Sequence, residues 1–380
     1  MLKFLIFANY LPHVINFRGK LLDAISNLGY EIHILAPELN SHPKELESLS
    51  KLGYYLHEVP LQRTGTNPIT DLRTLLSTYR LLRKIKPDVI LSYTIKPVIY
   101  GTLAAWLANV PKRFVLISGL GYTFSEVEEK DIRTSLQKFI HSLYTQALSK
   151  SHKVFFQNPD DLNLFKKLHI LKPNVPARVV NGSGVDISKF NVIPFPTTNS
   201  GEVKPSFLLI ARLLKDKGLI EYVEAAKIIK SQYPDTEFHL VGYLDENPAA
   251  ITQSELDEWV KSGVVKFWGK LSDVRPAIAA SSVYVLPSYR EGTSRSSLEA
   301  MAMGRPIITT DAPGCRETVV DSKNGFLVPI KTVDELAKAM EQFIKKPELI
   351  KTMGKASRKL TEERFDVNKV NDFMIKEMTL

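Results

Sequence analysis

The sequence predicts an α/β protein built from two doubly wound parallel-sheet domains. Short apolar segments with the pattern of buried strands alternate with stretches whose apolar residues keep helical spacing. The 380 residues are enough for two such domains with full cores. Residues 191–205 are rich in Pro, Ser, Thr and Gly, which predicts a linker. We therefore expect a first domain over residues 1–190, a second over residues 206–360, and a final helix over residues 361–380.

The first domain is predicted to hold strands at 4–8, 32–36, 89–92, 114–118 and 154–157. Parallel sheets bind ligands at the carboxyl ends of their strands, so the loops over residues 9–18, 93–100 and 119–124 are the candidate binding loops. His13 and Arg18 lie in the first loop, and Gly119 and Gly121 lie in the third. A histidine and an arginine in this position suit an acceptor diphosphate or acid–base chemistry, or else His13 only caps a backbone group.

The second domain begins with a predicted strand at 207–211, followed by strands at 238–241, 264–269, 283–286 and 306–310. Arg212 and Lys217 follow the first of these strands, and Gly218 opens the next helix. Two cations at the carboxyl end of a strand, facing a helix N-terminus, are suited to neutralising a diphosphate.

Residues 283–310 form a predicted strand, a glycine-bearing loop, a helix and a second strand. A helix N-terminus binds anions through its backbone N–H groups, and Gly292 permits a close approach to a phosphate. Glu291 and Glu299 bracket this region, and carboxylates accept hydrogen bonds from sugar hydroxyls. The arrangement suits a diphosphate with a sugar at each end, which is a nucleotide sugar. The candidate donor contacts in this segment are Gly292, Thr293, Ser294, Ser297, Leu298 and Glu299.

This segment, P-S-x-x-E-G-x(5)-L-E-A-M-A-x-G-x-P-I-I, resembles the retaining glycosyltransferases of family 4, which have the GT-B fold of two Rossmann-like domains facing across a cleft. Arg212, Lys217 and Gly218 match the R-x(4)-K-G pattern of that family. The resemblance implies a UDP-sugar donor whose diphosphate contacts Arg212 and Lys217. It also implies that Glu299 holds the ribose, that Glu291 lies near the donor sugar, and that the anomeric configuration is retained. In the GT-B fold the last helix crosses back to the first domain, so the resemblance implies the same for residues 361–380. We thus expect Arg212, Lys217 and Glu291 to be the catalytic residues.

The resemblance further implies that the loops at Gly242, Phe267 and Trp268 lie against the uracil base, although Trp268 is equally consistent with core packing. Many family members carry a histidine near position 118 that touches the donor sugar. This chain has Ser118 and Gly119, so its acid–base residue stays unassigned. The segments LDENPAA and GLG and the His-x(4)-Arg spacing resemble bacterial N-acetylgalactosaminyltransferases that act on undecaprenyl-diphosphate-linked sugars. Because the two cations perform the work of a metal ion, we expect activity without a metal or other cofactor.

Charge is distributed unevenly along the chain, whose formal net charge is +9. Residues 1–190 hold 24 Lys and Arg against 15 Asp and Glu, whereas residues 191–380 hold 26 of each. A basic half attracts nucleic acid, phospholipid headgroups or a lipid diphosphate. The predicted helix over residues 71–88 is either a basic amphipathic membrane surface or a core-facing helix with a solvated basic back. Its cations are Arg73, Arg80, Arg83, Lys84 and Lys86.

The single cysteine, Cys315, permits no internal disulfide and indicates a reducing compartment. Residues 1–8 are too short an apolar run for a signal peptide, and no run of 18 apolar residues occurs. We therefore expect a cytoplasmic enzyme at the inner face of the cytoplasmic membrane, with a UDP-sugar, a lipid-linked oligosaccharide and an anionic membrane surface as its partners.

Two other functions remain open at the level of sequence. A GT-B nucleotide-sugar epimerase shares the fold, and an assay of products from free UDP-sugar separates the two activities. A non-enzymatic nucleic-acid-binding protein is suggested by the pI near 9.3. Against this second function, no binding motif occurs and the basic residues are not interleaved with aromatics, so we expect no nucleic acid partner.

Overall fold

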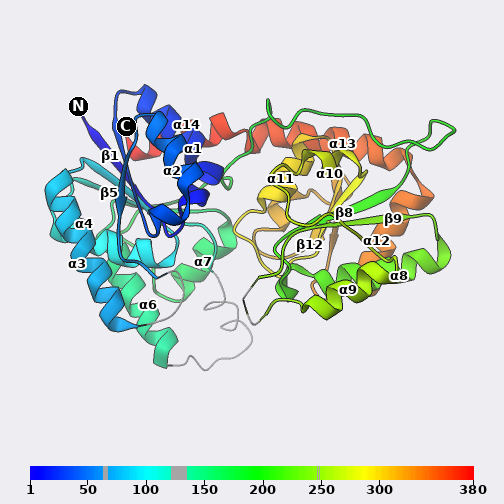
Figure 1. Ribbon diagram of the computed structural model, residues 1–380, viewed down its shortest axis with the longest axis horizontal. Helices are drawn as coiled ribbons and strands as arrows, with labels where there is room; N and C mark the ends of the chain where they lie inside the picture. Colours follow the sequence, from blue (N-terminus) through cyan, green and yellow to red (C-terminus); the bar gives the residue numbers. More distant parts are fainter. Residues whose placement is uncertain (63–66, 121–134, 246, 248) are drawn as a thin grey trace. The chain divides into compact units, whose positions relative to one another are not determined.

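The computed structural model describes residues 1–62, 67–120, 135–245, 247 and 249–380. The chain divides into two compact units (Figure 1). Unit 1 consists of Met1–Ser183 together with Asn368–Leu380, and unit 2 consists of Gly184–Val367.

Unit 1 is built on a parallel sheet whose strands lie in the order β3-β2-β1-β4-β5-β6-β7. Ile6 lies opposite Ile34 on one side and Leu91 on the other, so three apolar strands form the centre of the sheet. Strand order reverses between β1 and β4, which is where open parallel sheets bind ligands. The strands are β1 (Lys3–Phe7), β2 (Glu31–Ala36), β3 (Tyr55–Glu58), β4 (Val89–Tyr93), β5 (Lys112–Ile117), β6 (Lys153–Phe156) and β7 (Ala177–Val179).

The helices of unit 1 include the last helix of the chain. They are α1 (Leu11–Asn27), α2 (Pro43–Lys51), α3 (Pro68–Ile85), α4 (Thr102–Leu107), α6 (Ser135–Leu148), α7 (Pro159–Lys167) and α14 (Val367–Met378), with short turns at Leu39–Ser41 and Pro97–Gly101. Met374 and Met378 of α14 are fully buried in the same core as Phe4 of β1. Lys153 also donates to the Glu377 carboxylate at 2.8 Å, so the end of the chain completes unit 1.

Unit 2 is built on a second parallel sheet, in the order β10-β9-β8-β11-β12-β13. Its strands are β8 (Ser206–Ile210), β9 (Glu237–Val241), β10 (Lys266–Phe267), β11 (Val283–Leu286), β12 (Ile307–Thr310) and β13 (Gly325–Val328). Its helices are α8 (Leu219–Gln232), α9 (Gln253–Lys261), α10 (Arg275–Ala279), α11 (Arg295–Ala302), α12 (Val333–Lys345) and α13 (Glu348–Leu360), with short turns at Lys215–Lys217, Arg316–Thr318 and Thr361–Phe365.

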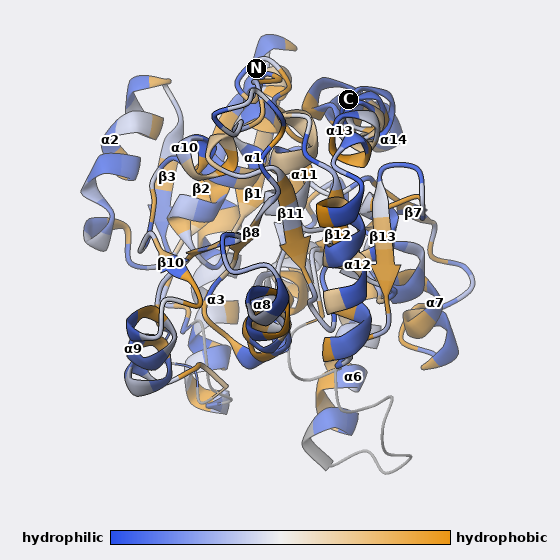
Figure 2. Ribbon diagram, turned by 90° about the vertical axis from the view of Figure 1, so that its right-hand side faces the viewer, coloured by the Kyte–Doolittle hydropathy of each residue, from blue (hydrophilic) through white to orange (hydrophobic). Residues whose placement is uncertain are grey.

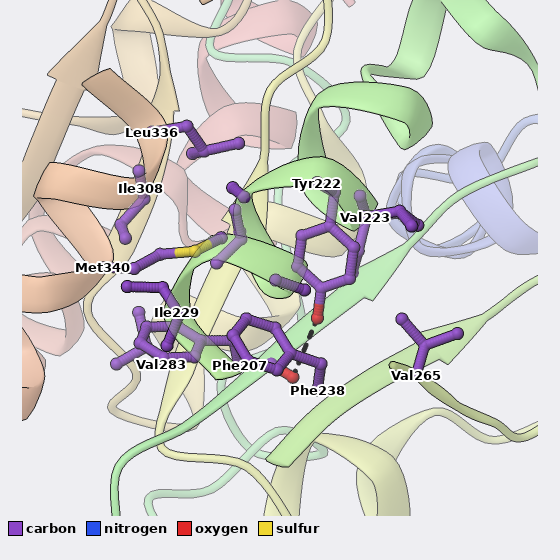
Figure 3. Packing of buried hydrophobic residues seen from close by; sticks show 14 of the residues in the cluster. Phe207, Tyr222, Val223, Ile229, Phe238, Val265, Val283, Ile308, Leu336 and Met340 are labelled. Atoms are coloured by element: carbon purple, nitrogen blue, oxygen red, sulfur yellow. Dashed lines mark hydrogen bonds between the residues drawn. The ribbon is translucent and has the colours of Figure 1, made fainter. Parts of the chain in front are cut away.

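In unit 2 the central strand β11 is hydrophobic, whereas the covering helix α12 is amphipathic. Figure 2 shows β11 in the hydrophobic colour, whereas α12 shows both colours because one face packs inward. In the core, Phe207 and Phe238 stack with ring centroids 5.2 Å apart. The buried hydroxyl of Tyr222 donates to the carbonyl of Phe207 at 3.0 Å, so a polar group is accommodated without loss of its hydrogen bond (Figure 3).

Two expectations from the sequence differ from the structure. Residues 9–18 are not a loop, because α1 begins at Leu11 and Pro12 is tolerated in the first turn of a helix. Residues 191–205 do not stand apart as a linker, because the guanidinium of Arg305 donates to the carbonyls of Ile193 and Pro194 and holds the segment on unit 2. The chain passes between the units at Ser183–Gly184 and again at Val367–Asn368.

The strands β3, β7 and β13 have no counterpart in the sequence prediction. β3 and β7 lie at the two edges of their sheet and are only partly buried, so neither shows a continuous apolar run. None of the helices in the described residues combines the length and apolarity that crossing a bilayer requires.

Candidate active site

The loop from β8 to α8 positions Lys217 at the carboxyl end of the second sheet. The loop closes through Gly218, whose φ of 71° is strained for any residue with a side chain. A Cβ at Gly218 would lie 2.2 Å from the carbonyl oxygen of Pro287, so the loop also depends on a close approach to the end of β11. The amide of Tyr289 donates to the carbonyl of Asp216 at 2.9 Å and ties the two loops together.

The loop from β11 to α11 presents Glu291 and is supported from the next strand. The amide of Glu291 donates to the carbonyl of Pro313 at 2.9 Å. Gly314 follows with a φ of 76°, and a Cβ there would lie 2.0 Å from the carbonyl oxygen of Glu291. The turn after β12 thus fixes the backbone from which Glu291 projects.

Lys217 and Glu291 meet as an ion pair. Their Nζ and Oε1 atoms are 2.8 Å apart, and the side chains are only 15% and 18% exposed. Burial lowers the pKa of Lys217, but the carboxylates of Glu291 and Asp216 raise it, and the net pKa lies above its ordinary value. Lys217 is therefore a firmly charged, partly desolvated cation, which is the state needed to stabilise negative charge on a leaving group.

Arg212 is more exposed than Lys217. Its Nη1 lies 3.1 Å from Oδ2 of Asp245, and its side chain is 49% exposed. The charge of Arg212 lowers the pKa of Lys217, so the two cations act on each other electrostatically. The structure thus brings Arg212, Lys217 and Glu291 to one edge of the sheet, with Asp245 as a partner that sequence reasoning missed.

The hydroxyl groups at the start of α11 form the helix cap. The Ser294 side chain accepts from the amide of Ser297 at 3.2 Å, and the Ser297 hydroxyl donates to Ser294 at 2.9 Å. Thr293 donates to the carbonyl of Gly292 at 2.9 Å. The Leu298 side chain is fully buried in the core, and its amide donates to the carbonyl of Ser294.

Ser296 and Tyr284 join the start of α11 to the end of β8. Their hydroxyls are 2.6 Å apart, and each also donates to the carbonyl of Ile210. This bridge holds the N-terminus of α11 beside the residues that lead to Arg212. The sequence signal was weak, because Ser296 is one of several small hydroxyl residues in a row.

Glu299 is nearly buried on α11 and pairs with Arg295, whose Nε lies 2.8 Å from Oε1. Burial raises the pKa of Glu299, while Arg295 and Lys189 oppose this shift by favouring the carboxylate. Sequence reasoning singled out Glu299 but missed Arg295. The i,i+4 spacing was the available signal, because it places the two side chains on the same face of a helix.

The three residues predicted to lie against the uracil base differ in their surroundings. Gly242 is a point of close approach, since a Cβ would lie 2.1 Å from the carbonyl oxygen of Ala211. Phe267 is half-buried and packs against the core of unit 2. The indole nitrogen of Trp268 donates to Nδ1 of His239 at 3.1 Å, which supports the alternative that Trp268 is a packing residue.

In unit 1, His13 and Arg18 both lie on α1, with Arg18 buried and His13 partly buried. His13 makes edge contacts with Tyr10 and Phe17. Gly119 follows β5 with a φ of 123°. The predicted acceptor residue Gly121 lies outside the described residues.

Buried polar atoms gather where the order of the first sheet reverses. The Tyr93 hydroxyl and Oδ1 of Asn9 are buried and have no hydrogen-bond partner within the described part of the chain. The guanidinium of Arg18 lies 5.8 Å from the centre of the Tyr93 ring. Burial raises the pKa of Tyr93, so its hydroxyl stays protonated. Asn9 and Tyr93 begin two of the candidate binding loops, but sequence reasoning did not single out either residue.

The described residues hold no group of three or more His, Cys, Asp or Glu side chains arranged to bind a metal ion. Cys315 is buried and packs near the carbonyl of Ser288, and burial raises the pKa of its thiol to about 12. A protonated, enclosed thiol is a poor nucleophile and a poor metal ligand.

Two parallel α/β units, one with a cation pair and a capped helix at the carboxyl end of its sheet, define a protein of the GT-B class. Residues 204–346 match the family model of glycosyl transferases group 1, and residues 3–158 match that of the glycosyl transferase 4-like domain. The chain belongs to this family of glycosyltransferases and is a hexosyltransferase.

Two relatives align with most of the chain. N,N'-diacetylbacillosaminyl-diphospho-undecaprenol alpha-1,3-N-acetylgalactosaminyltransferase of Campylobacter jejuni is 27% identical over 90% of this chain and 89% of its own length. UDP-Gal:alpha-D-GlcNAc-diphosphoundecaprenol alpha-1,3-galactosyltransferase of Escherichia coli is 26% identical over 83% of this chain and 82% of its own. A glycosyltransferase from Rickettsia africae has the same fold, with a TM-score of 0.78 and 18% identity over 99% of this chain and 97% of its own.

Proposed function

We propose that this protein transfers an N-acetylhexosamine, with N-acetylgalactosamine favoured, from a UDP-sugar to a polyprenyl-diphosphate-linked glycan during bacterial glycan assembly. The observation that carries the proposal is the meeting of Lys217 and Glu291 at 2.8 Å between two glycine-shaped loops. The activities for which both aligned relatives are named support the acceptor class, because each name specifies a sugar linked to diphospho-undecaprenol.

In this proposal unit 2 binds the donor. Lys217 and Arg212 stabilise the charge that builds on the departing UDP, Glu291 faces the donor sugar, and Glu299 accepts hydrogen bonds from the ribose. An acceptor hydroxyl attacks the anomeric carbon on the face from which UDP leaves, so the C–O bond to UDP breaks and the configuration is retained. The proton of the acceptor hydroxyl passes to a phosphate oxygen of the departing UDP as the new C–O bond forms. Polar and cationic residues of unit 1, Arg18 and His13 among them, contact the acceptor.

A screen of UDP-sugars with a polyprenyl-diphosphate-linked acceptor tests the proposal. We expect mass spectrometry to show a product heavier by one N-acetylhexosamine, and NMR to show the same anomeric configuration as in the donor. Interconversion of free UDP-sugars without any acceptor product would instead support the epimerase activity.

The proposed reaction uses protein cations where other transferases use a divalent metal. We expect a chelator to leave turnover unchanged, because Lys217 and Arg212 already supply the positive charge at the diphosphate. Loss of activity on chelation that added Mn²⁺ or Mg²⁺ restores would contradict this prediction.

We also propose that the enzyme works at an anionic membrane surface, where its lipid-linked acceptor resides.

A further inference from the structure

Helix α3 of unit 1 buries several polar side chains and exposes several apolar ones. Asp71, Thr74 and Thr78 are buried, whereas Ile69, Leu72 and Leu76 are 66%, 55% and 43% exposed. A surface helix normally turns its apolar side chains toward the core and its polar ones toward water. The exposed apolar side chains therefore need a partner outside this part of the fold.

The rotational setting of α3 is fixed by hydrogen bonds on its buried side. The Asp71 carboxylate accepts from Nζ of Lys96 at 2.8 Å and from the Tyr100 hydroxyl at 2.8 Å. The Thr74 hydroxyl donates to the carbonyl of Pro60. The Lys96 and Asp71 side chains are each only 12% exposed, so rotating the helix would leave a buried charge without its partner. The outward position of Leu72 and Leu76 follows from these contacts.

Cations continue the exposed stripe toward the end of the helix. Arg73, Arg80, Arg83 and Lys84 are exposed and fall on the same side of the helix as the three apolar residues, given 3.6 residues per turn. The only acidic residue between positions 68 and 87 is Asp71, which Lys96 neutralises. The stripe thus joins a mostly apolar first half to a cationic second half, and the helix carries no acidic side chain on this face.

Helix α4 packs against α3 (Figure 1) and also exposes apolar side chains, Trp106 at 42% and Leu107 at 48%. Lys150 lies over the Trp106 ring at 4.4 Å. Tryptophan and lysine together are typical of protein surfaces at the level of lipid headgroups. Both helices therefore expose apolar side chains close to cationic ones.

We infer that the exposed stripe of α3 (Ile69, Leu72, Arg73, Leu76, Arg80, Arg83 and Lys84) docks this protein on a bilayer of anionic phospholipid. The arginines and Lys84 contact the headgroup phosphates, and Ile69, Leu72 and Leu76 enter the upper part of the acyl layer. The inference rests on the proposed function, because a lipid-linked acceptor requires an enzyme at the bilayer surface. It assigns that contact to a defined face of one helix.

Binding of the full chain to vesicles tests the inference without a donor or an acceptor. We expect the protein to sediment with vesicles of phosphatidylcholine and phosphatidylglycerol, but hardly with vesicles of phosphatidylcholine alone. The triple variant Arg80→Gln, Arg83→Gln, Lys84→Gln should bind about 100-fold more weakly, at roughly fivefold for each cation removed. Its matched control is Lys227→Gln, Lys338→Gln, Lys345→Gln, which removes three exposed cations from unit 2 and should bind as the wild type does.

The apolar part of the stripe is tested separately. Leu72→Ser with Leu76→Ser should weaken vesicle binding by about tenfold. The control pair Leu28→Ser with Leu52→Ser, which changes two exposed leucines elsewhere in unit 1, should leave binding unchanged. Circular dichroism confirms that each variant is folded, and transfer to a short-chain prenyl-diphosphate acceptor that stays in solution should proceed at the wild-type rate.

Three outcomes would overturn the assignment. One is equal wild-type binding to both kinds of vesicle, and another is equal binding of either stripe variant and its control. The third is a wild type that does not bind vesicles but self-associates in light scattering, with both stripe variants abolishing the self-association. The stripe would then contact a second copy of the chain. Vesicle binding by a wild type that transfers no sugar would leave the membrane assignment standing while the proposed function fails.

Discussion

At the scale of single residues, the candidate site consists of charges that are neutralised in pairs. Lys217 faces Glu291, Arg212 faces Asp245 and Arg295 faces Glu299. Removing one member of a buried pair leaves the other uncompensated, so a variant tests both the chemistry and the stability of the site. Each test therefore needs a folded-state control.

Lys217→Ala should lower kcat by roughly 10²–10³-fold, because a charged contact to the leaving group is lost in the transition state. Steady-state kinetics measures the effect. Lys215→Ala, in the same turn but exposed, should keep wild-type turnover. Undiminished kcat in a Lys217→Ala protein with a normal circular dichroism spectrum would remove Lys217 from the mechanism.

Arg295 should decide the pH range over which UDP binds. Burial raises the pKa of Glu299 and Arg295 opposes this shift, so the carboxylate that we propose accepts from the ribose is lost as the pH falls through that pKa. In Arg295→Met the pKa rises further, and UDP affinity should begin to fall at a higher pH than in the wild type. Titration calorimetry across the acidic range measures this difference.

Lys345→Met provides the matched control for Arg295→Met, because it removes the cation of another i,i+4 pair, with Glu341 on α12. Its pH profile should match that of the wild type. Glu299→Ala should weaken UDP binding at every pH. Identical profiles for Arg295→Met and the wild type would show that Arg295 does not act through Glu299.

At the scale of elements, glycines decide how closely the loops of unit 2 approach each other. Gly218 and Gly263 have nearly the same φ, 71° and 69°. A Cβ at Gly218 would meet the carbonyl oxygen of Pro287 at 2.2 Å, whereas a Cβ at Gly263 would meet nothing within 4 Å. The two positions thus separate the strain of a left-handed backbone from the effect of steric overlap.

Gly263→Ala should cost roughly 1–2 kcal/mol of unfolding free energy through backbone strain alone and leave turnover unchanged. Gly218→Ala should cost more and should also reduce kcat, because the overlap displaces the loop that carries Lys217. Denaturant unfolding and initial rates measure both effects. Equal stability and equal activity of the two variants would argue against the close approach.

At the scale of the whole molecule, the chain leaves unit 1, forms unit 2 and returns to complete unit 1 with α14. Met374 is fully buried, whereas the adjacent Phe373 is 37% exposed. A domain completed by a distant segment depends on that segment for part of its core, so changes in the last 13 residues should act on unit 1.

Met374→Ala should destabilise unit 1 by about 2–5 kcal/mol, the usual range for truncating a buried methionine. Calorimetry should show the transition of unit 1 at a lower temperature and that of unit 2 unchanged. Phe373→Ala is the neighbouring control and should shift neither transition appreciably. A shift of the unit 2 transition in Met374→Ala would contradict the division of the chain.

Most central strands were predictable from local patterns, and so was the motif that we propose binds the donor. β11 is a short apolar run, and the E-G loop, the helix and the R-x(4)-K-G pair each depend on residues close in sequence. Edge strands such as β3 were not predictable, because partly exposed strands carry little hydrophobic signal. The predicted loop over residues 9–18 was wrong because α1 begins only a few residues after β1, with Pro12 tolerated in its first turn.

The sequence by itself determined the fold class, the family and the basic character of the first half, because strand pattern, motif spacing and charge are local properties. Only the tertiary structure decided which charges meet and which face of α3 points outward. The sequence left open whether that helix turns its apolar residues to the core. The Lys96–Asp71 pair joins residues 25 positions apart and sets the rotation of α3, and such a contact exists only after folding.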